Sequence, residues 1–142
     1  MLDVNYVLGL VDGEGSFTVY VRNPSSKTKT KRKVVVEPRF YIKLNEDDKD
    51  ILYQLKDFFS CGSIYYQRDK RKNHKNCYRY EVFNRKELNE VIIPFFTKHN
   101  LKFKTKINDF NLFCDLMSKI NNGNHLNEKG LEEIYKIKQK MH

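Results

Sequence analysis

The sequence predicts an α+β domain, residues 1–142, in which helices cover one face of a four-stranded antiparallel sheet. Two observations lead to this prediction. Four segments alternate apolar and polar residues, as strands buried on one face do, and they form two pairs, each separated by a basic loop. The remaining segments carry apolar residues at helical spacing. The predicted order is α-β-β-α-β-β-α-α-α, and 142 residues are enough to bury one core.

The first half of the chain has local signals for its elements. Asp3 or Asn5 can cap the first helix, which we expect to stop at Gly13 or Gly15 because glycine readily adopts the left-handed cap conformation. Pro38 interrupts the second strand and predicts a bulge or an edge strand. The strands are expected over 16–23, 34–44, 63–68 and 77–83. Their core-facing residues in the first pair are Phe17, Val19, Val21, Val34, Val36, Phe40, Ile42 and Leu44.

Helices follow each strand pair. Asn45 is expected to cap a helix that closes at Gly62, Asn84 starts a helix through Ile93, Pro94 begins a short helix or turn, and Asn127 caps the last helix. The long helix over 105–120 is expected to turn Ile107, Phe110, Phe113, Cys114, Met117 and Ile120 inward.

The opposite face of the sheet is polar, aromatic and basic. Its mixture of donors and acceptors can distinguish base edges, whereas a purely basic face would only hold phosphates. A β-ribbon also fits the major groove of DNA, which is about 12 Å wide. Two basic hairpin tips predict phosphate contacts, with flexible solvated loops as the alternative. For any single member of the face, the alternative is an ordinary solvated strand residue. The face comprises Thr18, Tyr20, Arg22, Lys33, Glu37, Arg39, Tyr41, Lys43, Tyr65, Gln67, Arg79 and Glu81, and the tips (27–33 and 68–75) carry Lys27, Lys29, Lys31, Arg32, Lys33, Arg68, Lys70, Arg71 and Lys72.

The composition favours a polyanionic partner. Lys and Arg number 27 against 18 Asp and Glu, a formal net charge of +9, which suggests nucleic acid; a merely soluble basic protein is the alternative. Cys61, Cys77 and Cys114 form no CxxC pair, so neither a zinc site nor a disulfide framework is indicated. We find no signal peptide, transit peptide or membrane-length apolar run. The expected location is intracellular: an organelle (chloroplast or mitochondrion) or a bacterial cytoplasm.

The stretch Tyr6–Phe17, YVLGLVDGEGSF, is the most unusual in the chain. As a helix it is apolar all round and must be buried on every side. Gly9 and Gly13 fall on one helical face and allow a second backbone to come close. Glu14 then lies at the negative end of the helix dipole, which is unfavourable unless a positive group such as a divalent cation lies beside it. A buried helix ending in exposed acids is the alternative.

Residues 7–15, VLGLVDGEG, resemble the signature of LAGLIDADG homing endonucleases in register, and the following Ser16-Phe17 is also favoured there. The turn 61–64, the segment 101–110 and the stretch 125–131 also look like that family. The resemblance implies a LAGLIDADG homing endonuclease-like fold, which agrees with the pattern-derived layout. It further implies an intron-encoded, site-specific nuclease that hydrolyses phosphodiester bonds of double-stranded DNA.

A single copy of the signature implies a homodimer. In the family, two signature helices pack across a two-fold axis, here through Tyr6, Gly9, Leu10 and Gly13. Glu14 from each copy would then bind Mg²⁺ (or Mn²⁺), with the Gly13 carbonyl as an extra ligand. Such a dimer would make a double-strand break in a long, roughly palindromic target.

The resemblance also assigns supporting residues. It places Lys104 in the catalytic pocket, with Lys102 and Lys106 as rivals in an alternating lysine run. Many relatives carry a water-organising glutamine where this chain has Leu44; the adjacent Asn45 either substitutes for it or only caps a helix. Asp12 is expected to be a helix-end cap or a supporting group.

Two other functions stay open. The first is an intron-splicing maturase or a cleavage-deficient DNA- or RNA-binding protein on the same fold. The second is a basic structural protein of an RNA–protein particle.

Overall fold

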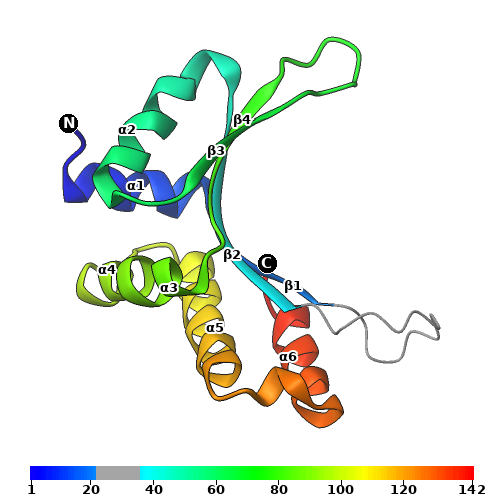
Figure 1. Ribbon diagram of the computed structural model, residues 1–142. Coiled ribbons are helices and arrows are strands. Elements are labelled where there is room, and N and C mark those ends of the chain that lie inside the picture. The colour runs from blue at the N-terminus through cyan, green and yellow to red at the C-terminus, as the bar shows by residue number, and fades with distance from the viewer. Residues whose placement is uncertain (22–35) are drawn as a thin grey trace.

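The computed structural model describes residues 1–21 and 36–142. Its elements follow the predicted order through the fourth strand, after which the described residues form four α-helices where the prediction had three (Figure 1). The elements are α1 (Val4–Glu14), β1 (Gly15–Val21), β2 (Val36–Asn45), α2 (Lys49–Phe59), β3 (Ser63–Gln67), β4 (Cys77–Val82), α3 (Arg85–Glu87), α4 (Ile93–Lys98), α5 (Lys104–Asn121) and α6 (Glu128–Gln139). A π turn over Leu88–Ile92 joins α3 to α4, and 3-10 turns over Glu46–Asp48 and Asn124–Leu126 precede α2 and α6. In these ranges no helix has the length and apolar character needed to cross a membrane.

The four strands form one antiparallel sheet in the order β1-β2-β4-β3. Because residues paired across antiparallel strands share a face, the register decides which side chains lie together. Phe17 pairs with Phe40, and Ile42 pairs with Tyr80, on the covered face. The residues between them in sequence project from the other side of the sheet, as the alternation predicted.

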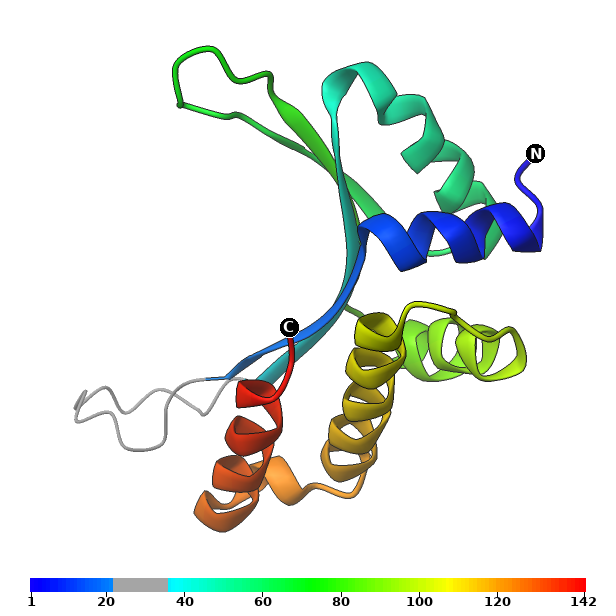
Figure 2. The same cartoon turned by 180° about the vertical axis from the view of Figure 1, so that it is seen from behind.

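The sheet is curved, and the helices lie on its convex side, leaving the concave side open (Figure 2). The core under the helices is rich in aromatic rings. The ring of Phe17 lies 5.1 Å from that of Phe40, and Phe96 from α4 lies 5.4 Å from Phe17 and 5.6 Å from Phe40. Phe113 of α5 is fully buried against the same cluster. Large apolar side chains contributed by β1, β2, α4 and α5 therefore hold the helices to one face.

Pro38 lies in a central strand, yet at a position that is locally an edge. It pairs with Val19 of β1, whereas β2 pairs with β4 only from Phe40 onward, because β4 ends at Val82. On the β4 side no strand neighbour is present at Pro38, so the missing N–H breaks no ladder there. The expectation of a bulge or an edge strand is therefore wrong: β2 lies between β1 and β4, and its register with β1 runs through Pro38 without interruption.

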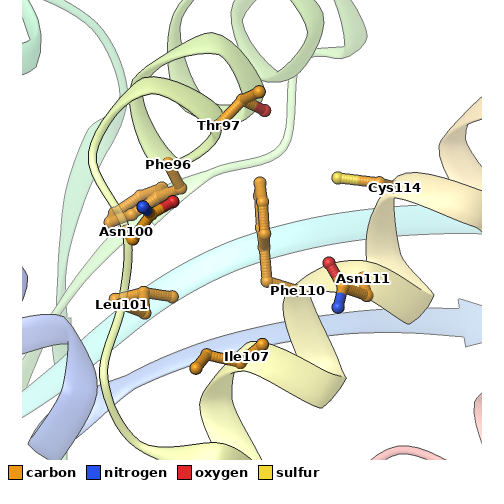
Figure 3. Close-up of a pocket in the computed structure, with 8 residues that line it drawn as sticks. All are labelled: Phe96, Thr97, Asn100, Leu101, Ile107, Phe110, Asn111 and Cys114. Carbon is orange, nitrogen blue, oxygen red and sulfur yellow. The ribbon is translucent and has the colours of Figure 1, made fainter.

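Ile107 differs from the prediction, since it is 38% exposed rather than buried. It lies in the first turn of α5 and lines a hollow of about 390 Å³ between α4 and α5, beside Leu101 and Phe110 (Figure 3). Leu116, which was not expected in the core, is fully buried instead. The helical period was right, but Ile107 faces this hollow, which no side chain fills.

Candidate functional site

Glu14 is the last residue of α1 and its side chain is exposed. The helix ends because Gly15 turns into β1 with φ −78° and ψ 157°, while its N–H still donates to the Val11 carbonyl. The conformation is extended, so the expected left-handed cap is wrong. The reason for glycine is space: a Cβ at Gly15 would lie 2.7 Å from Val11 Cγ1 and 2.9 Å from its carbonyl oxygen. This tight turn places the Glu14 carboxylate where the helix meets the sheet.

Asp12 joins this helix end to a distant part of the chain. Its carboxylate is 6% exposed and accepts hydrogen bonds from the N–H of Lys102 and the N–H of Phe103, each at 3.1 Å. Lys102 and Phe103 directly precede the first residue of α5, so Asp12 of α1 holds the segment that leads into that helix. Of the two expected roles, the contacts of Asp12 match the supporting group and not a cap at the end of α1. The end of α1 and the start of α5 therefore lie side by side (Figures 1 and 2).

This junction brings the lysine run to the signature. Lys106 is partly buried and its Nζ donates a hydrogen bond to the Gly15 carbonyl, one residue after Glu14. Lys104, the lysine that the resemblance selected, is the first residue of α5 and is exposed. Lys102 also has an exposed side chain. Lys106 and Lys104 thus have distinct environments: the ammonium group of Lys106 is hydrogen-bonded to the turn, whereas that of Lys104 faces solvent.

Asn45 and Leu44 lie farther along β2. The Asn45 side-chain oxygen accepts a hydrogen bond from the Asp47 N–H at 2.9 Å, so it caps the 3-10 turn before α2. Leu44 is partly buried and packs against the core. Gly15, which follows α1, pairs with Ile42 of β2. Asn45 lies three residues farther along β2, roughly 10 Å from the end of α1 at ~3.3 Å per residue.

One chain supplies few ligands for a cation. In the described ranges, no group of three or more His, Cys, Asp or Glu side chains is positioned to hold a metal ion. The helix end offers the exposed Glu14 carboxylate and the Gly13 carbonyl, while Asp12 is already engaged by two N–H donors. These oxygens suit a hard divalent cation, which would need further ligands from phosphate, water or a second chain.

A stripe of four residues along α1 is left open. Tyr6, Gly9 and Gly13 are exposed and Leu10 is partly buried. A Cβ built at Gly9 or Gly13 meets nothing within 4 Å. Glycine inside a helix costs about 1 kcal/mol relative to alanine, and here packing within the described chain gives no reason for it.

The register gathers the predicted base-reading residues on the concave face. Thr18 pairs with Arg39, Tyr20 with Glu37, Tyr41 with Glu81, and Arg79 of β4 with both Lys43 and Tyr65. Lys138 of α6 also belongs here, since its Nζ lies 5.6 Å from the centre of the Tyr20 ring. No local pattern indicates Lys138, because only the packing of α6 beside β1 brings it to the face. Arg22, Lys27, Lys29, Lys31, Arg32 and Lys33 lie outside the described residues.

Glu81 is the buried centre of a charged cluster on this face. It is 6% exposed, and its Oε1 accepts hydrogen bonds from Arg39 at 3.1 Å and Arg79 at 3.2 Å. Arg39 also donates to Glu37 at 2.6 Å, and the Arg79 guanidinium lies 3.6 Å from the centre of the Tyr41 ring. Burial lowers the pKa of Arg39, but the hydrogen bonds and charges of Glu37 and Glu81 more than offset this, so its pKa is raised. The buried position of Glu81 does not suit direct contact with a base.

The second basic tip is internally ordered. Asp69 accepts hydrogen bonds from the guanidinium of Arg71, and this pairing holds the pKa of Asp69 well below its usual range. Arg68, Lys70 and Lys72 are exposed around it. Gln67, at the end of β3, is exposed as well. The tip therefore presents cations on a fixed turn.

Known proteins resemble this chain along most of its length. The family model described as LAGLIDADG endonuclease matches residues 7–117. The solved structure of the homing endonuclease I-TnaI has a TM-score of 0.79 and 36% identity, covering 99% of this chain and 88% of that chain. I-SmaMI, bound to an uncleaved DNA target in the presence of calcium ions, has a TM-score of 0.82 and 31% identity, covering 100% of this chain and 45% of that chain. These structures confirm the predicted fold class.

Two curated relatives are also described as endonucleases. "Probable intron-encoded endonuclease 2" of Neurospora crassa is 32% identical over 135 residues, or 94% of this chain. "Probable intron-encoded DNA endonuclease 1" of Mycosarcoma maydis is 31% identical over 108 residues, or 76% of this chain. This chain spans only 28% and 34% of the lengths of these two relatives. The signature helix, the open curved sheet and these matches lead to one conclusion: the chain belongs to the LAGLIDADG endonuclease family.

Proposed function

We propose that this chain is a site-specific homing endonuclease that acts as a homodimer on a long, roughly palindromic double-stranded DNA target. The observation that carries the proposal is the junction of α1 and α5. There an exposed carboxylate, Glu14, and the lysines of α5 are held together where the helix layer meets the concave sheet. The concave face would read base edges, and the basic tips would hold phosphates.

The open stripe of α1 supports the dimer. Gly9 and Gly13 leave space that nothing in the described chain fills, and Tyr6 and Leu10 border that space with apolar surface. A second copy of α1 packed on this stripe would use the close approach that glycine permits. The matched lengths support a dimer: the chain covers 45% of the I-SmaMI chain, so two copies would match its length, and it covers 88% of the I-TnaI chain.

The residues at the helix end fit Mg²⁺ (or Mn²⁺). Glu14 from each copy and the Gly13 carbonyl would hold the cation, together with DNA phosphate. When bound, a divalent cation activates water and stabilises the charge on the leaving oxygen. Without a counterion, the Glu14 carboxylates of the two copies would repel each other at the negative ends of their helices.

We assign different tasks to the two lysines. As water bonds to phosphorus and a P–O bond of the strand breaks, negative charge grows on the phosphoryl oxygens. The exposed ammonium of Lys104 would stabilise that charge. Lys106 would hold the Gly15 carbonyl and hence the turn that presents Glu14. Lys104→Met should therefore lower the cleavage rate without changing thermal stability, whereas Lys106→Met should lower both.

A cleavage-deficient binding protein, such as an intron-splicing maturase, is the second candidate. One observation favours it: Leu44 packs against the core and Asn45 caps a turn. Neither side chain is then placed to order water in the manner that the family's usual glutamine implies. In the endonuclease proposal, Asn45 would have to take this task despite its distance from Glu14.

The test is selection of cleaved sites from a randomised DNA library with Mg²⁺, followed by the Glu14→Gln variant on the selected site. The proposal expects a site with two-fold symmetry, a double-strand break, and loss of cleavage in Glu14→Gln with binding retained. Retained cleavage in Glu14→Gln would remove this residue from the site. Specific binding of DNA or RNA without cleavage by the parent chain would favour the second candidate.

A further inference from the structure

The cluster around Glu81 combines features that a solvated ion-pair network does not have. One carboxylate oxygen, Oε1 of Glu81, accepts from two arginines on two strands. The Glu81 side chain is 8% exposed, against 35% for Arg39 and 24% for Arg79. Glu81 therefore lies beneath the two guanidinium groups on the concave face.

Both arginines are fixed by more than this contact. Both terminal nitrogens of Arg39 donate hydrogen bonds, one to Glu81 and the other to Glu37. Arg79 lies over the ring of Tyr41, which limits its plane. The Nε atoms of both arginines are buried and have no hydrogen-bond partner in the described structure. A buried, unpaired N–H is costly, so holding the guanidinium groups in these positions has an energetic penalty that the paired contacts offset.

The cluster is formally neutral, since two arginines face two glutamates. Attraction to phosphate depends on net positive charge, so a neutral cluster is a weak phosphate site. Guanine recognition has a different requirement: a planar guanidinium must present two N–H groups to O6 and N7 in a set orientation. Preorganising that orientation removes the entropy cost of ordering the side chain when DNA binds.

We propose that Glu81 is a specificity-determining positioning residue, which holds Arg39 and Arg79 on the concave face as two fixed readers of guanine. The inference deepens the proposed DNA recognition and rests on it. It replaces the expectation that Glu81 contacts a base directly. Because a single carboxylate holds both arginines, discrimination at two base-pair positions depends on one residue.

The experiment measures binding-site profiles by selection from a randomised library without divalent metal, for the parent and for Glu81→Gln. The parent should require guanine at positions that Arg39→Ala and Arg79→Ala identify. Glu81→Gln should reduce the preference for guanine at both sets of positions together, by roughly tenfold, which lies within the ~1–3 kcal/mol of a bidentate contact. Glu37→Gln should relax only the Arg39 positions, because Glu37 contacts only Arg39 within the cluster.

A remote variant controls for charge. Glu133→Gln adds the same unit of positive charge, but Glu133 pairs with Lys119 at 3.7 Å on the helical side. Its profile should match that of the parent. A second control combines Glu81→Gln with Arg39→Ala and Arg79→Ala. The binding-site profile of this triple variant should match that of the Arg39→Ala, Arg79→Ala double variant. A further change at a cytosine position would show that Glu81 contacts a base itself, and would overturn the inference.

The restraint on the arginines is measured without DNA. In NMR relaxation measurements, the side-chain N–H groups of Arg39 and Arg79 should have high order parameters in the parent and lower ones in Glu81→Gln. The melting temperatures of the two proteins are compared, so that a general loss of stability is not mistaken for a local loss of restraint. Equal order parameters would refute positioning, even if DNA binding is specific. A parent chain that selects no sequence would instead refute the proposed function, and with it the reading role of the arginines.

Discussion

Replacing Asp12 with alanine should separate the two halves of the candidate site. The change leaves the N–H groups of Lys102 and Phe103 without their acceptor at a junction where Asp12 is 6% exposed. It also removes the contact that joins the end of α1 to the segment leading into α5. Asp12→Asn is milder, because an amide oxygen in the place of Oδ1 can still accept from both donors.

The size of the effect follows from these contacts. A hydrogen bond to a charged group contributes about 1.5–3 kcal/mol, so losing two gives roughly 3–6 kcal/mol for Asp12→Ala. Asp12→Asn should cost about 1–2 kcal/mol, since it loses the charge but keeps the acceptor. At ~2–4 °C per kcal/mol for a chain approaching 150 residues, the expected fall in Tm is roughly 10–15 °C for alanine and about 5 °C for asparagine.

The assay is urea and thermal unfolding at one fixed protein concentration, because dimerisation would make Tm depend on concentration. Asp3→Ala is the matched control. Asp3 is likewise a carboxylate that accepts from a backbone N–H, that of Tyr6 at 2.8 Å, but it is exposed and caps only its own helix. It should cost about 1 kcal/mol. An Asp12→Ala variant no less stable than Asp3→Ala would refute the argument that Asp12 ties α1 to α5.

Three further predictions concern the dimer, the basic tip and pH. Gly9→Leu should prevent dimerisation, measured by sedimentation, while leaving the monomer folded, because a Cβ at Gly9 meets nothing within 4 Å in its own described chain; a stable dimer would disprove the proposed seam. Lys70→Ala and Lys72→Ala should each lower the slope of log K against log salt for DNA binding by about 0.9 if each contacts a phosphate, while Lys119→Ala, on the helical side, should not. Burial, with a nearby arginine, lowers the pKa of His125 below its usual 6.5. Since the unfolded chain then binds the proton more readily, the stability contribution of His125 is complete above pH 6.5 and is lost as pH falls through the folded-state pKa, and His125→Leu should flatten that decline in urea midpoints.

The elements and their faces could be predicted because they depend on local pattern. Alternation in β1 and β2 sets which residues are buried, and Asn127 caps α6 as expected, accepting from the Gly130 N–H at 2.7 Å. The exceptions depend on what lies next to an element. Ile107 is exposed although its helical period is correct, and Gly15 is needed for space rather than for a left-handed backbone.

The candidate site was predictable only in part. The signature placed Glu14 at a helix end, since that information is local. The partner of Asp12 lies 90 residues away in the chain, and no spacing rule connects them. Likewise, an alternating strand placed Glu81 on the concave face, but its burial comes from arginines on two different strands. Lys106 and Lys138 acquire their positions through helix packing, which the sequence pattern does not encode locally.

The period-two register of the sheet has a consequence for how target preference can change among related chains. Side chains of the core and of the concave face alternate along the same strands, so a substitution at Thr18 or Lys43 would alter the proposed recognition surface without changing the volume of the core. Most outward positions can therefore drift one at a time, each altering a local part of the preferred target. Glu81 is different, because two arginines, Arg39 and Arg79, form ion pairs with its carboxylate. Mutational paths through this position would shift two parts of the target in a single step.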